Sequence, residues 1–255
     1  MSNMNRRDLL KGSLATGAAL VGSATLPTLS AKLAAQVPAA PRAGTSRDRA
    51  LFDIAKRELT RAGDAIWRKD IVGICDYGVH SARQRFYLVN LDREEVRTMH
   101  VSHGAGSDPE HDGWLNHYSN VEGSNATSKG AYVTWEWYQG RYGTSVRLGG
   151  LDPTNDAALR RYIVMHRAAY AEPPHLERYG RMGRSNGCFA YGTADFHEIL
   201  MNLSGGRLLY ADSLGLQENG AMLSRDEQLA LNEPRTQMLK ADNPSAMQRR
   251  VPGAF

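Results

Sequence analysis

Short apolar runs recur along the chain, and turn-forming residues separate them. Runs of five to eight residues match β-strands and are too short for the helices of a buried core. The runs are 71–77, 85–91, 96–102, 131–138, 144–148, 162–166 and 207–211. The pattern predicts a mainly β domain with peripheral helices at 47–67 and 195–203, and it shows no parallel βαβ rhythm.

The N-terminus carries features of an export signal. Two adjacent arginines, Arg6 and Arg7, precede a weakly apolar stretch over 9–26 and small residues around Ala35. This order resembles a twin-arginine signal peptide, whereas an uncleaved anchor is disfavoured because glycine, serine and threonine dilute the apolar stretch. The chain is therefore predicted to be periplasmic or secreted, with no stable membrane insertion after cleavage. The predicted segments are a signal peptide (1–35), a linker (36–46), a catalytic domain (47–215) and a polar tail (216–255).

Composition bounds the function only loosely. The chain has 255 residues, 42% hydrophobic and 23% charged, which is typical of a globular protein. Its net charge of +4 favours anionic partners without choosing among them. No nucleic-acid recognition motif is found, so nucleic acid is not an expected partner.

The two cysteines, Cys75 and Cys188, are too few for a disulfide framework. One bridge between them stays open as an alternative, although Cys75 lies in a run typical of a buried strand. Cys188 follows Ser185-Asn186-Gly187, where a glycine allows close approach of a substrate carbonyl. His166 ends an apolar run and could serve as the base that a nucleophilic thiol needs. On spacing alone, a structural cysteine and a core histidine explain these residues better.

The residues around Cys188 and His166 favour the catalytic interpretation of this pair. The run Tyr162-Ile163-Val164-Met165-His166, followed by Gly183-Arg184-Ser185-Asn186-Gly187-Cys188, resembles the YkuD-like L,D-transpeptidase family, in its murein L,D-transpeptidase catalytic domain branch. The resemblance spans about 76–211 and implies an L,D-transpeptidase-like β-sandwich or barrel. It also implies cysteine-dependent acyl transfer on peptidoglycan stem peptides, with release of D-alanine and cross-linking of the cell wall.

The resemblance implies roles for individual residues. Cys188 would form a thioester and His166 would move the proton, with Gly187 and Ser185 completing the catalytic set. Backbone N–H groups of Gly187 and Cys188 are candidates for an oxyanion hole. The predicted substrate contacts are Arg184, Arg167, Asn186, His103 and Tyr132.

The chain departs from the family pattern at three places. Arg167 stands where many relatives have glycine, and Asn186 stands where many have histidine. Phe189-Ala190-Tyr191 replaces an arginine-containing continuation after the cysteine. These departures leave the nucleophile and base in place and put the choice of substrate and acceptor in doubt.

No cofactor and no metal are expected. Histidines at 100, 103, 111 and 117 have a composition that could bind zinc, but His100 and His103 would point to opposite faces of a strand. Two alternative functions stay open. Water as the acceptor would make the protein an L,D-carboxypeptidase or a peptidoglycan-cleaving peptidase on the same Cys/His site. A non-catalytic wall-binding module would need neither Cys188 nor His166.

Overall fold

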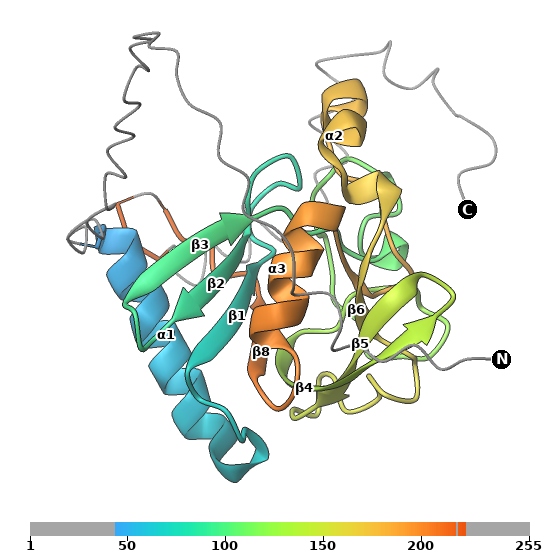
Figure 1. Ribbon diagram of the computed structural model, residues 1–255. Helices are drawn as coiled ribbons and strands as arrows, with labels where there is room; N and C mark the ends of the chain where they lie inside the picture. The colour runs from blue at the N-terminus through green and yellow to red at the C-terminus, as the bar shows by residue number, and fades with distance from the viewer. Residues whose placement is uncertain (1–43, 218, 223–255) are drawn as a thin grey trace, which may run out of the picture. The chain divides into compact units, whose positions relative to one another are not determined.

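The computed structural model describes residues 44–217 and 219–222 and contains one mixed, curled sheet of eight strands (Figure 1). The strands lie in the order β3-β2-β1-β8-β4-β5-β6-β7. Their bounds are β1 Ile71–Asp76, β2 Phe86–Asn90, β3 Glu95–Met99, β4 Gly130–Gly140, β5 Gly143–Gly150, β6 Val164–Arg167, β7 Phe189–Tyr191 and β8 Leu208–Asp212. The predicted mainly β fold is confirmed.

Three α-helices accompany the sheet in the described residues: α1 Ser46–Ala62, α2 Pro173–Tyr179 and α3 Thr193–Leu203. Three short 3₁₀ helices lie at η1 Gly63–Ala65, η2 Ala105–Ser107 and η3 Ala169–Ala171. α1 begins with a capping box, in which Thr45 and Asp48 bond each other's backbone N–H. It ends at Ala62 and is capped by Gly63, whose φ of 58° suits glycine, so the helix stops earlier than the predicted 67.

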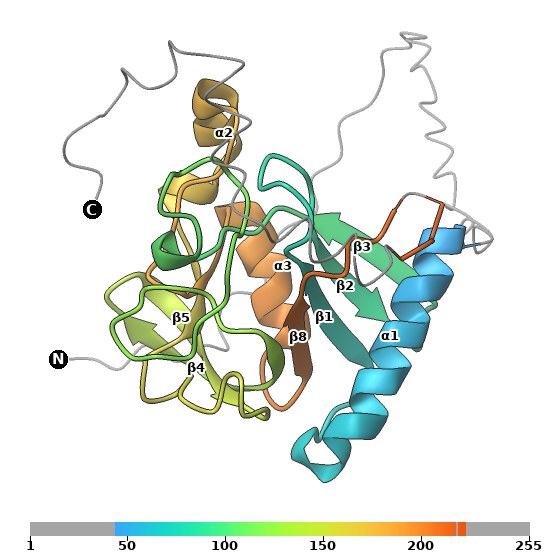
Figure 2. The ribbon, with the colours of Figure 1, turned by 180° about the vertical axis from the view of Figure 1, so that it is seen from behind.

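The two faces of the sheet bury different helices. Alternate residues of β1 point to opposite sides, so Ile71 and Cys75 join one core cluster while Val72 and Ile74 join the other. The first cluster contains Phe196, Ile199 and Leu203 of α3, and the second contains the apolar face of α1. Figures 1 and 2 show the two helices on opposite faces of the sheet.

Two strand pairs are parallel, which corrects the expectation of no βαβ rhythm. β1 pairs with β8 in parallel, and β6 pairs in parallel with β7. The chain between β6 and β7 passes through η3 and α2, so it forms a short crossover. A strand of three residues and a helix of seven give too little periodicity to be seen in the sequence.

The predicted signal peptide, most of the predicted linker and most of the predicted tail lie outside the described residues. At the tail's start, Leu216 is buried and forms a bridge with Met222. Within the described part of the chain, no helix is both long and apolar enough to cross a membrane.

Candidate active site

A tight loop presents Cys188 at the start of β7. The Ser185 hydroxyl donates to the Cys188 carbonyl (2.6 Å) and accepts the Gly187 N–H (3.1 Å), which closes the loop on itself. Gly187 has a φ of 105°, and a β-carbon there would lie 2.7 Å from the Ala126 carbonyl oxygen. Glycine is therefore required for both conformation and space. Because Ser185 holds the Gly187 N–H, only the Cys188 N–H remains from the predicted oxyanion pair.

The register of the parallel pair β6·β7 puts Cys188 and His166 on one face. Met165 is opposite Phe189, and both are buried in the core cluster that contains α3. Successive residues alternate between faces, so His166 and Cys188 both point away from that cluster. The Cys188 thiol donates to the carbonyl oxygen of Tyr162, which lies two residues before β6, at a sulfur–oxygen distance of 3.6 Å.

A backbone carbonyl orients His166. Its Nδ1 lies 2.9 Å from the Arg167 carbonyl oxygen, and a carbonyl can only accept, so Nδ1 carries the proton. Nε2 of the neutral ring is then free to act as a base. His166 is 1% exposed, and its imidazole stacks on the Tyr142 ring at a centroid distance of 4.6 Å. Burial lowers the pKa of His166, and the hydrogen bond to Arg167 opposes that shift.

The surroundings of Cys188 favour the protonated thiol. Burial raises the pKa of Cys188, while a hydrogen bond from the Val164 backbone and the charge of Arg161 oppose the shift. Arg161 is fixed by the carbonyls of Ser119 (2.8 Å) and Ala126 (2.6 Å). Its position beside the thiol was missed in the sequence, where it is one of several scattered arginines.

A buried polar network braces the loop from behind. The fully buried Arg85 donates to Nδ1 of His103 (2.7 Å), and Nε2 of His103 therefore donates to Asp108 (3.1 Å). The His103 carbonyl accepts the Ser185 N–H at 2.9 Å, and Arg184 donates to the Asp108 carbonyl. Neither Arg85 nor Asp108 was predicted, because a single sequence does not show which charges are buried.

Two predicted substrate contacts lie in the interior. His103 is 2% exposed with both ring nitrogens occupied, and Tyr132 is fully buried with its hydroxyl bonded to Ser128. Each therefore serves as packing or bracing in this structure, and a direct contact with substrate is not retained for either. Arg184, which precedes the loop, is partly buried, whereas Asn186 within the loop and Arg167 at the end of β6 are exposed.

Both cysteines are free, and Cys75 is fully buried in β1. The alternative of a bridge between Cys75 and Cys188 is therefore absent from this structure. Among the described residues, no group of three or more histidine, cysteine, aspartate or glutamate side chains is placed to hold a metal ion.

Two family models match parts of the chain. The family model for the L,D-transpeptidase catalytic domain matches residues 45–211, and a model for the twin-arginine translocation signal sequence matches residues 3–22. No curated protein matches the chain.

Among solved structures, an L,D-transpeptidase from Mycobacterium smegmatis is 15% identical with a TM-score of 0.34, and the match covers 56% of this chain and 58% of that one. The helical cell shape determining protein Pgp2 from Campylobacter jejuni is 13% identical with a TM-score of 0.37, covering 73% and 61% respectively. The chain thus spans less than two thirds of the length of either structure.

The family match extends over more than half of the chain and includes β6, the loop before Cys188 and Cys188 itself. The N-terminal match identifies a twin-arginine export signal, so the protein is exported to the periplasm or beyond. The chain belongs to the L,D-transpeptidase catalytic domain family.

Proposed function

We propose that the protein is a peptidoglycan L,D-transpeptidase that uses Cys188 as nucleophile and His166 as base, within a catalytic domain at 47–215. The observation that carries the proposal is the register of β6 and β7: alternation from Phe189 back to Cys188, the residue before β7, gives Cys188 the same face as His166. The Arg167 carbonyl supports it further, because it leaves Nε2 of His166 able to accept a proton.

In the acylation step, the Cys188 sulfur attacks the carbonyl carbon of the third residue of a stem peptide. His166 takes the thiol proton and passes it to the leaving nitrogen. The C–N bond breaks, D-alanine departs, and a thioester remains on Cys188. The Cys188 N–H is the backbone donor available to stabilise the oxyanion of the tetrahedral intermediate.

In the second step, an acceptor amine attacks the thioester, His166 takes a proton from it, and the Cys188 thiol re-forms when the C–S bond breaks. Water in place of the amine would give hydrolysis. Arg161 supports both steps, because its positive charge lies near the sulfur that leaves as a thiolate.

Mass spectrometry of the mature protein with tetrapeptide muropeptides tests the proposal. We expect D-alanine release and a cross-linked dimer, both abolished in Cys188→Ala and His166→Gln and both retained in Cys75→Ala. Release of D-alanine without a dimer would make the protein a carboxypeptidase. Absence of both products from fully reduced wild-type protein would contradict the enzyme proposal.

A further inference from the structure

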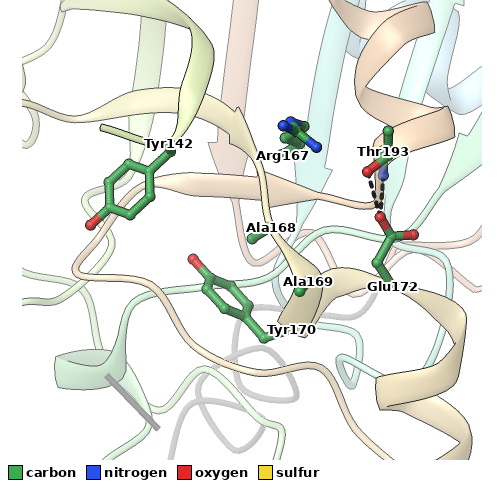
Figure 3. Close-up of a pocket in the computed structure, with 7 residues that line it drawn as sticks. All are labelled: Tyr142, Arg167, Ala168, Ala169, Tyr170, Glu172 and Thr193. Atoms are coloured by element: carbon green, nitrogen blue, oxygen red, sulfur yellow. Dashed lines mark hydrogen bonds between the residues drawn. The ribbon is translucent and has the colours of Figure 1, made fainter. Parts of the chain in front are cut away.

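A cavity of about 310 Å³ lies at the end of β6, and one of its lining residues, Tyr142, stacks on the proposed base His166. Its lining residues are Tyr142, Arg167, Ala168, Ala169, Tyr170, Glu172 and Thr193 (Figure 3). Its volume is at the small end of the range for ligand sites, which fits an amino acid better than a disaccharide peptide.

Two tyrosines join the cavity to the reaction centre. Tyr142 lines the cavity and stacks on the His166 imidazole. Tyr170 also lines it; burial is the main cause that raises the pKa of Tyr170, and the charge of a Cys188 thiolate adds to that shift. A group bound in the cavity would lie next to the Tyr142 ring that stacks on the proposed base.

The charges in the cavity are arranged asymmetrically. Arg167 is exposed, its guanidinium lies against the turn at Gly143, and no carboxylate of the described residues forms an ion pair with it. Glu172, in contrast, is held by Thr193, which donates to it from both its N–H (2.7 Å) and its hydroxyl (2.6 Å). The side chain left to bind an incoming charged group is thus a guanidinium, whose fork suits a carboxylate.

The proposed reaction needs a carboxylate-binding site in both of its steps. D-Alanine leaves as an amine with a carboxylate on the adjacent carbon. By microscopic reversibility, the site that holds this leaving group also holds an incoming amine of the same kind.

We propose that the cavity is the leaving-group and acceptor subsite, and that Arg167 binds the α-carboxylate of the amino acid whose amine leaves or attacks. The inference rests on the proposed function. The shared ligand chemistry is an α-amino carboxylate, supplied either by a free D-amino acid or by the diamino-acid side chain of a neighbouring stem.

Exchange of isotopically labelled D-alanine into a tetrapeptide tests the role of Arg167, with labelled D-alaninamide as the competitor that lacks the carboxylate. We expect wild-type protein to incorporate D-alanine about tenfold or more faster than the amide, as a charge-assisted contact predicts. Arg167→Gln should bring this ratio close to one, and Arg167→Lys should restore part of it. Arg141→Gln is the matched control, because Arg141 is exposed beside Tyr142 but does not line the cavity.

The outcomes separate the two proposals. An unchanged ratio in Arg167→Gln would overturn the assignment of the subsite while leaving the enzyme proposal intact. If wild-type protein exchanges neither compound, NMR titration of tyrosine-labelled Cys188→Ala protein with D-alanine decides the matter. Shifts of the Tyr142 and Tyr170 signals that vanish with Arg167→Gln would support the subsite, and no shifts would refute it. Dimer formation that follows the same Arg167 dependence would identify the diamino-acid stem as a source, and exchange alone would identify the free D-amino acid.

Discussion

Replacing Asp108 by asparagine should destabilise the protein strongly, because this carboxylate anchors a buried network. Asp108 is 0% exposed and accepts hydrogen bonds from the N–H groups of Asp112 (2.9 Å) and Gly113 (3.0 Å) and from His103 (3.1 Å). His103 in turn accepts from Arg85, which is also 0% exposed. Through the neutral imidazole, Asp108 is thus the negative group that balances the buried guanidinium.

The geometry sets the size of the effect. Three donors converge on the two carboxylate oxygens of Asp108, and the amide of asparagine has one acceptor oxygen and one NH₂ group. Whichever way it is oriented, the NH₂ group faces at least one N–H of a neighbour. The change therefore removes a charge-assisted bond and leaves the charge of Arg85 uncompensated in the interior. Breaking a buried charged pair in this way costs about 3–5 kcal/mol.

Urea unfolding followed by circular dichroism measures this loss in the free energy of unfolding. Asp156→Asn is the control, because Asp156 is exposed and its bond from Asn120 can be kept by an amide oxygen, so its effect should stay within about 0.5 kcal/mol. A double-mutant cycle with Arg85→Met should give a coupling energy of about 1–3 kcal/mol. A loss below about 1 kcal/mol in Asp108→Asn, or additive effects in the cycle, would refute the role of the network.

Three further predictions concern the proposed pair and its loop. Gly187→Ala should lower kcat/KM by about a hundredfold in steady-state kinetics, because the new β-carbon would lie 2.7 Å from the Ala126 carbonyl oxygen and displace the nucleophile. Retained activity would contradict the close packing. Ser185→Ala should cost about 1–3 kcal/mol in urea unfolding, because the buried Gly187 N–H loses its partner; no change would mean that the loop is held by other contacts. In a plot of kcat/KM against pH, the loss of activity at acid pH should have its midpoint below pH 6.5, because burial lowers the pKa of His166 and activity is lost as this base becomes protonated. A midpoint above pH 6.5 would contradict a neutral, buried base.

The strands were predictable where alternation was strong. β1, β2, β4 and β8 fall within or close to runs of apolar residues, because one or both of their faces are buried. β7 was missed, because three residues between a loop and α3 carry no period. The crossover through α2 was missed for a similar reason, since its two prolines look like a turn when only the sequence is available.

The candidate site was predictable only in part. Cys188 and His166 stand out through their motif, whereas Arg161 owes its place to carbonyls at 119 and 126 that the fold brings to it. His103 and Tyr132 were predicted as substrate contacts. Burial decides against that, and burial depends on which elements cover a strand, which this sequence does not show.

The acid–base state of the proposed pair follows from burial and not from the motif. Burial lowers the pKa of His166 and raises that of Cys188, so both shifts favour a neutral imidazole and a neutral thiol at rest. A preformed thiolate–imidazolium pair would require both shifts to run the other way. On the proposed mechanism, proton transfer to Nε2 therefore accompanies attack on the carbonyl. The fixed neighbours of the thiol, the Val164 N–H and then the charge of Arg161, stabilise the charge only as it develops. Alkylation of Cys188 by iodoacetamide should accordingly be slow at pH 7 and should still be accelerating above pH 9, whereas a plateau near neutrality would show that the pair is ionised before substrate arrives.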